Sequence, residues 1–166
     1  GEQPGLRPQE KSKFERALRA LAVHPPAYAA GTAGVQPDMP MTEAGRLIWR
    51  RELTEILLSE AGARLGDDIE FVHDMRVATR RARASATLFS AWFAPKAVEP
   101  HRRALRKTGR RLGAVRDLDV ALAKLRKYAS GLPAEDQQAL RALDDHWRRA
   151  RREAYVRLLD WMDSGG

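Results

Sequence analysis

Four long stretches with helical periodicity fill most of this chain after residue 41, and short turn signals separate them. In each stretch apolar residues recur every three or four positions, which is the spacing that aligns one face of an α-helix. We expect helices at about 42–65, 68–93, 100–128 and 133–163, and the only short segment with strand character is 69–72. Because consecutive amphipathic helices joined by short turns pack around a shared core, this pattern predicts an all-α fold, an antiparallel four-helix bundle.

Residues 1–41 precede these helical stretches and differ from them in composition. The segment 24–40 is rich in Pro, Gly and Ala, which is typical of a linker or an irregular wrap. One short extra helix is expected at 12–22, where apolar residues share a face. We therefore predict a lead or linker at 1–41, followed by a four-helix bundle at 42–163.

The sequence HDMRVATRRAR at 73–83 combines a histidine with closely spaced arginines. His73, Arg76, Arg80 and Arg83 follow one another at intervals of three or four residues, so they form one stripe along a helix. The stripe contains no acidic residue, whereas an ordinary solvated helix face interleaves acids and bases. Since arginine carries a planar fork of donors that matches phosphate and carboxylate groups, the stripe predicts a surface that meets an extended anion.

A second basic stretch follows in the next expected helix, where Arg103, Arg106 and Arg110 share one face and Lys107 flanks it. Residues 71–111 hold eleven basic side chains and two acidic ones, a net charge of +9 against +8 for the whole chain. Neighbouring antiparallel helices lie about 8–10 Å apart, so two facing basic stripes form a trough whose repulsion a bound polyanion relieves. A merely solvated basic surface is the competing interpretation, and the lack of acids in both stripes favours the anion site.

No arrangement typical of a metal site accompanies these stripes. The chain has no cysteine, and none of its four histidines has another histidine three or four residues later, so we expect no metal and no cofactor. Asp117 and Asp119 lie about 200° apart on a helix, so we interpret one of them as the partner of a neighbouring arginine, with Mg²⁺ binding as the less favoured alternative. No apolar run approaches the roughly 20 residues that span a bilayer, and we expect a cytoplasmic protein without a membrane partner.

The run VHDMRVATRRARA at 72–84, followed by RRLGAVRDLDV at 110–120, resembles the CHAD family, the conserved histidine α-helical domain. The resemblance implies an all-helical domain that binds inorganic polyphosphate through basic residues lining a central groove or pore, in association with polyphosphate granules. It also implies an upstream CYTH-type triphosphate domain, because the segment SKFERAL at 12–18 resembles the tail of such a domain. We therefore predict a non-catalytic polyphosphate-binding module. The residues that match the family's first basic motif are His73, Arg76, Arg80, Arg81 and Arg83, and those that match its second basic helix less strictly are Arg106, Lys107 and Arg110.

One departure from the family pattern concerns the second half of the domain. CHAD domains usually contain two similar bundles, whereas no second H-x-x-R pattern follows Asp119, because His146 is followed by Trp147-Arg148-Arg149. Three explanations stay open: a fragment, a short natural form, or half of a site that another copy completes. A half-domain would expose apolar surface and favour self-association.

Three other functions compete with polyphosphate binding. A non-specific nucleic-acid-binding helical domain would use the same arginines, because phosphate contacts alone give affinity without sequence specificity. A phosphohydrolase would need a metal or a positioned base beside the trough. A pure scaffold would leave the basic faces incidental.

Overall fold

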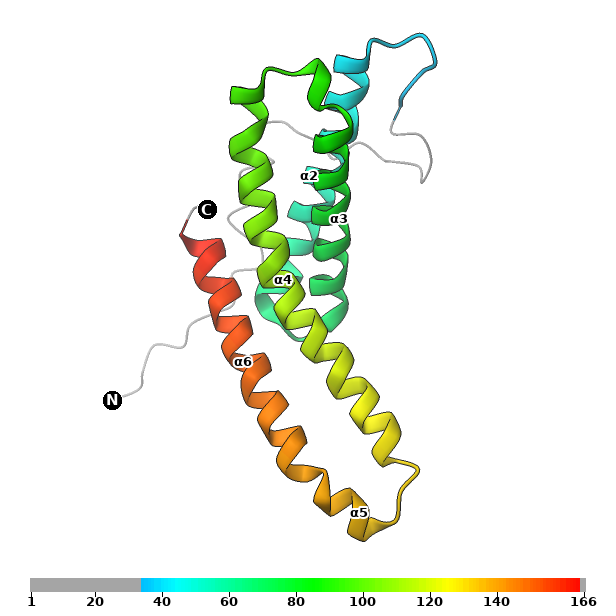
Figure 1. The fold of residues 1–166 in the computed structure, drawn as a ribbon, viewed down its shortest axis with the longest axis vertical. Coiled ribbons are helices and arrows are strands. Elements are labelled where there is room, and N and C mark those ends of the chain that lie inside the picture. The colour runs from blue at the N-terminus through cyan, green and yellow to red at the C-terminus, as the bar shows by residue number, and fades with distance from the viewer. Residues whose placement is uncertain (1–33, 165–166) are drawn as a thin grey trace, which may run out of the picture. The chain divides into compact units, whose positions relative to one another are not determined.

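The computed structural model describes residues 34–164, where all regular structure is helical. The elements are α2 (Met41–Leu65), α3 (Ile69–Leu88), the 3₁₀-helix η1 (Ser90–Trp92), α4 (Pro95–Ala129), α5 (Ala134–Ala139) and α6 (Arg141–Asp163). Figure 1 shows α3 between α2 and α4, with α6 running along α4. The predicted all-α fold class is therefore confirmed. The short helix predicted at 12–22 and most of the predicted lead lie outside the described residues.

The turn between α2 and α3 depends on Gly66 and Asp68. Gly66 has a φ of 74°, a left-handed conformation that glycine adopts without steric cost, and its amide donates to the Gly62 carbonyl at 3.1 Å. Asp68 caps α3, because its side chain accepts a hydrogen bond of 2.8 Å from the amide of Glu70. The one candidate strand, 69–72, is the first turn of this helix.

Three predicted helix boundaries are wrong. The second helix ends at Leu88, and η1 forms the turn that follows it. The third begins at Pro95 rather than near Pro100, because Pro95 has its fixed φ and missing N–H at the first helical position, where neither has a cost. Pro100 then removes a single hydrogen bond from a helix of 35 residues. The fourth predicted helix is divided at Leu140 into α5 and α6.

One hydrophobic cluster joins the four long helices. The centre of this cluster is α3, which contributes the largest share and packs against α2 on one side and α4 on the other. Small side chains on α3 let these neighbouring helices approach closely. The arginines of α3 lie on the face of the helix that is not buried in this cluster. The buried members are Ile56, Ala63, Val72, Met75, Ala78, Ala82, Leu112, Val115, Ala154 and Leu158.

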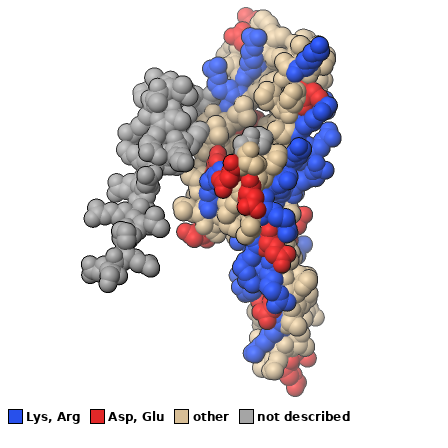
Figure 2. All heavy atoms as spheres, turned by 90° about the vertical axis from the view of Figure 1, so that its left-hand side faces the viewer, with Lys and Arg blue, Asp and Glu red and all other residues tan. Residues whose placement is uncertain are grey.

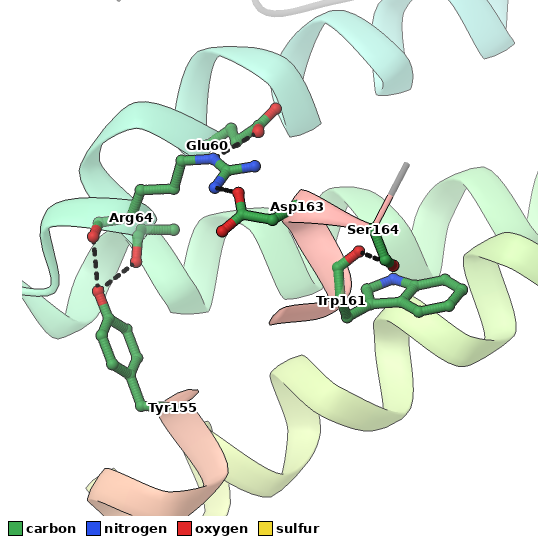
Figure 3. Close-up of polar contacts among 7 residues, drawn as sticks. Glu60, Arg64, Tyr155, Trp161, Asp163 and Ser164 are labelled. Atoms are coloured by element: carbon green, nitrogen blue, oxygen red, sulfur yellow. Dashed lines mark hydrogen bonds and ion pairs between the residues drawn. The ribbon is translucent and has the colours of Figure 1, made fainter. Parts of the chain in front are cut away.

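The C-terminal end of α2 is fastened to α6 by polar contacts (Figure 3). The hydroxyl of Tyr155 donates to the carbonyl oxygens of Ala63 and Arg64, each at 2.9 Å, and burial raises the pKa of this phenol. The guanidinium of Arg64 lies 2.7 Å from the carboxylate of Glu60 and 2.6 Å from that of Asp163. Although burial opposes its charge, these two carboxylates raise the pKa of Arg64. Arg64 therefore serves a structural role, because its guanidinium is paired with two carboxylates.

The helix α4 extends well past α3, and α6 runs along its C-terminal part (Figure 1). At about 1.5 Å per residue, the 35 residues of α4 give roughly 50 Å against roughly 30 Å for the 20 residues of α3. Within this pair, Asp119 is 4 % exposed, and its carboxylate accepts a hydrogen bond of 2.9 Å from Arg151 of α6. The prediction that an aspartate of this segment orients an arginine is confirmed for Asp119.

Candidate anion-binding site

Four arginines from two helices line one recess at the seam between α3 and α4. Arg80 and Arg83 come from α3, Arg102 and Arg106 come from α4, and the recess has a volume of about 270 Å³. Its remaining walls are the small side chains of Ala84 and Thr87, which we include when we call it the α3–α4 recess. Guanidinium groups are the donors best matched to phosphate oxygens, so the recess offers several forks to one anion.

The arginines converge because both helices present one continuous stripe to the seam. On α4 the stripe runs through Arg102, Arg106, Gly109 and Gly113, again at intervals of three or four residues. A Cβ atom added to Gly109 would lie 3.8 Å from Nη1 of Arg83, and one added to Gly113 would lie 3.7 Å from Nε of Arg76. The two glycines therefore lie against the arginine face of α3 and leave room for its guanidinium groups.

Most of the positive charge in the α3–α4 recess is uncompensated. Within residues 34–164, no carboxylate forms an ion pair with Arg80, Arg83 or Arg106. Arg102 lies 3.4 Å from the carboxylate of Glu99 at the rim. Like charges held together in this way repel one another, and an anion that enters the recess removes the repulsion.

Glu99 restrains the rim of the recess through two arginines. A hydrogen bond of 3.0 Å from Arg103 lowers the pKa of Glu99, and the charges of Arg102 and Arg106 lower it further. Arg103 is held by Glu99 outside the recess, and its side chain is 71 % exposed. The structure therefore does not bring Arg103 together with the other predicted site residues.

Two more predicted residues of α4 lie outside the α3–α4 recess, on the side of the helix that faces α6. The Lys107 ammonium is 5.6 Å from the centre of the Trp161 ring of α6, and Arg110 lines a separate recess between α4 and α6. The structure therefore places Lys107 and Arg110 outside the α3–α4 recess. The reason is geometric: with about 100° between successive residues, Lys107 and Arg110 are rotated from Arg106 by about 100° and about 40° in one direction, whereas Arg102 is rotated by about 40° in the other.

The remaining predicted residues of α3 lie beside the recess rather than in it. Arg76 is half-buried next to Gly113, and Arg81 is exposed outside the lining. His73 is also half-buried, and its Nδ1 is buried without a hydrogen-bond partner among the described residues. Near His73, Arg116 lies 3.3 Å from Glu70 and so links α4 to the first turn of α3.

Sequence reasoning missed Arg102, although a signal for it existed. Gly109 and Gly113 interrupt the basic stretch of this helix, and a glycine inside a helix is typical of a close approach by a neighbour. Counting back from them by steps of three and four residues leads to Arg106 and Arg102. The glycines therefore mark the stripe that faces α3 better than the density of basic residues does.

Comparison with known families decides the relationship of this chain. The family model described as the CHAD domain matches residues 47–166. The chain belongs to the CHAD domain family. The matched region contains α3, α4 and the α3–α4 recess, so the recess lies in the part of the chain that defines the family. A search of curated proteins gave no match.

Two further properties of residues 34–164 bear on the chemistry of the site. None of their helices has the length and apolar character that crossing a membrane requires. They contain no group of three or more His, Asp and Glu side chains placed to hold a metal ion. The chemistry that the recess itself offers is the binding of anionic oxygens by fixed cations.

Proposed function

We propose that this chain is a non-catalytic module that binds inorganic polyphosphate, with the α3–α4 recess as its first contact. The observation that carries the proposal is the convergence of Arg80, Arg83, Arg102 and Arg106 on one recess. Membership of the CHAD family, whose members bind this polymer, supports the same ligand. His73 and Arg76 continue the basic stripe along α3 and extend the contact beyond the recess.

The lining of the recess favours a ligand of phosphates without bases. Proteins that bind single-stranded nucleic acids combine a basic groove with aromatic side chains on which bases stack. The walls of the α3–α4 recess consist of arginines, Ala84 and Thr87, with no aromatic ring among them. Non-specific nucleic-acid binding is therefore the second candidate, supported only by the phosphate contacts that both ligands share.

The proposed setting of the module follows from the family. The protein works in the cytoplasm at polyphosphate granules, and residues 1–41 connect the bundle at 42–163 to an upstream CYTH-type domain. Self-association, or a second bundle supplied by another chain, completes a wider basic surface.

Calorimetric titration with long-chain polyphosphate at low salt tests the proposal. We expect binding that weakens as salt rises, and a loss of roughly 30-fold in affinity when Arg80→Ala is combined with Arg106→Ala, because each lost charge-assisted contact is worth about 1 kcal/mol. Lys124→Ala with Lys127→Ala is the matched control, since it removes two exposed charges from the distal part of α4. Equal affinities of the two double variants, or tighter binding of duplex DNA than of polyphosphate at the same salt concentration, would contradict the proposal.

A further inference from the structure

A second basic recess lies on the other flank of α4, where that helix meets α6. Its volume is about 460 Å³, and its charged walls are Arg110 and Arg111 of α4 and Arg157 of α6. Asp160 is the single acidic residue among the residues that line it. We call this cavity the α4–α6 recess. Like the α3–α4 recess, it carries more positive than negative charge.

Trp161 forms one wall of the α4–α6 recess and contacts two cations of α4. Its indole Nε1 donates a hydrogen bond of 2.9 Å to the hydroxyl of Thr108, which fixes the ring against α4. The guanidinium of Arg111 lies 4.4 Å from the ring centre and the ammonium of Lys107 lies 5.6 Å from it. Both distances are within the range of cation–π attraction, so the ring gathers two cations at one site.

The arginines of this recess are nearly free of carboxylate partners. Arg157 lies 3.8 Å from Glu153, a loose contact between two side chains that are both more than 60 % exposed. No ion pair within residues 34–164 involves Lys107, Arg110 or Arg111. Exposed pairs of the Arg157 type contribute little energy, so an anion can displace Glu153 at small cost.

A ridge of arginine joins the two recesses across α4. Arg106 lines the α3–α4 recess, and Arg110 lines the α4–α6 recess. Residues four apart on a helix are neighbours, with Cβ atoms about 5–6 Å apart, so no uncharged gap separates the two cavities. Figure 2 shows Lys and Arg side chains in a band along the length of one face of the molecule, with Asp and Glu side chains among them.

We infer that the α4–α6 recess is a second subsite for the same polymer, so that one long polyphosphate chain crosses the Arg106–Arg110 ridge and occupies both recesses. This inference rests on the proposed function and adds to it a dependence on chain length. A short anion such as tripolyphosphate occupies the α3–α4 recess alone. A long chain gains the additional contacts of Arg110, Arg111 and Arg157, because the second recess is reached without a second binding event in solution.

The experiment compares tripolyphosphate with long-chain polyphosphate on the full 166-residue chain. In the variant that combines Arg110→Ala with Arg157→Ala, affinity for the long chain falls roughly tenfold, whereas affinity for tripolyphosphate changes less than about twofold. The plot of log affinity against log salt concentration for the long chain becomes shallower by about 1.4, since each contact to a single-stranded polyanion contributes about 0.7. Both substituted residues are exposed, and a thermal unfolding midpoint equal to that of the control checks that the variant folds.

The control for this experiment is again Lys124→Ala with Lys127→Ala, which removes the same charge from α4 away from the ridge. If the Arg110/Arg157 variant binds the long chain as tightly as this control does, the second subsite is excluded while the proposed function stands. If it loses affinity equally for both ligands, the length dependence is wrong. If the unmodified chain binds no long-chain polyphosphate, the proposed function and the second subsite fail together.

Discussion

The two sides of α3 contact glycines of the neighbouring helices in opposite ways. On the α2 side, a Cβ atom added to Gly62 would overlap the ring of Phe71, and one added to Gly45 would lie 3.0 Å from Cγ of Phe89, the residue that caps α3. On the α4 side, a Cβ atom on Gly109 would have its nearest contact at 3.5 Å, which is an ordinary van der Waals distance. Glycine is therefore required for close packing on one side, and on the other side it leaves space beside arginines.

This difference distinguishes a closely packed side of α3 from a side that carries unpaired arginines. Against α2, the close approach of Phe71 to Gly62 leaves no room for a side chain at position 62. Against α4, the exposed residues Arg80, Arg83 and Arg106 have no ion-pair partner within residues 34–164, and like charges held near one another repel. The stability of the bundle should therefore respond to changes at the α2 side, and anion affinity should respond to changes at the α4 side.

The largest expected effect is that of Gly62→Ala, which tests the α2 side directly. The new methyl group would collide with Phe71, and displacement of that partly exposed ring lowers the free energy of unfolding by about 1–2 kcal/mol, even after the gain in helix propensity. Denaturant unfolding measures the change. Unchanged stability would mean that the two helices are not held as closely as the contact indicates.

The combination of Gly109→Ala with Gly113→Ala should have the opposite sign. Both new methyl groups find ordinary contact distances, so the gain in helix propensity raises the free energy of unfolding by about 1 kcal/mol in total. Measuring this variant beside Gly62→Ala in the same denaturant series sharpens the comparison. If the Gly109/Gly113 variant were destabilised as much as Gly62→Ala, the two sides of α3 would not differ in how closely they are packed.

The smallest expected effect concerns Glu99, at the rim of the α3–α4 recess. Its carboxylate competes with an anion for Arg102 and Arg103, and the lowered pKa means that it stays ionised at neutral pH. Glu99→Gln should therefore strengthen polyphosphate binding roughly two- to threefold, as expected for a weak exposed pair. The affinity is compared at pH 7 and low salt; weaker binding by Glu99→Gln would show that the carboxylate organises the arginines instead of restraining them.

The fold was predictable because apolar periodicity and turn residues encode it locally. Gly66 and Asp68 end one helix and cap the next, and the acid-free stripe through Arg80 and Arg83 lies on one face of α3. The start of α4 was missed because Pro95 and Pro100 are both acceptable as a first helical residue, and only the apolar contact of the buried Val98 favours the earlier start.

The composition of the recess could be predicted only in part. Periodicity places Arg103, Arg106 and Arg110 on one face of a helix, but it does not show which neighbouring helix that face meets. The path of α6 decides this, because it places Trp161 beside Lys107 and Arg111 and so separates them from α3. Whether Arg102 or Arg103 faces α3 depends on the rotation of α4 about its own axis, because successive residues differ by about 100°. Tertiary packing fixes that rotation.

The ion pair between Asp119 and Arg151 has a consequence for how far α6 can slide along α4. A shift of α6 by seven residues in one direction would place Asp144 opposite Asp119, and in the other direction it would place Leu158 there. The first alternative opposes two carboxylates, and the second leaves a buried carboxylate without a partner, so both neighbouring registers are penalised. The ion pair between Asp119 and Arg151 thus fixes the axial register of α6 against α4. It thereby sets the position of Arg157 relative to Arg110, and with it the spacing of the cations that a phosphate chain would encounter in the α4–α6 recess.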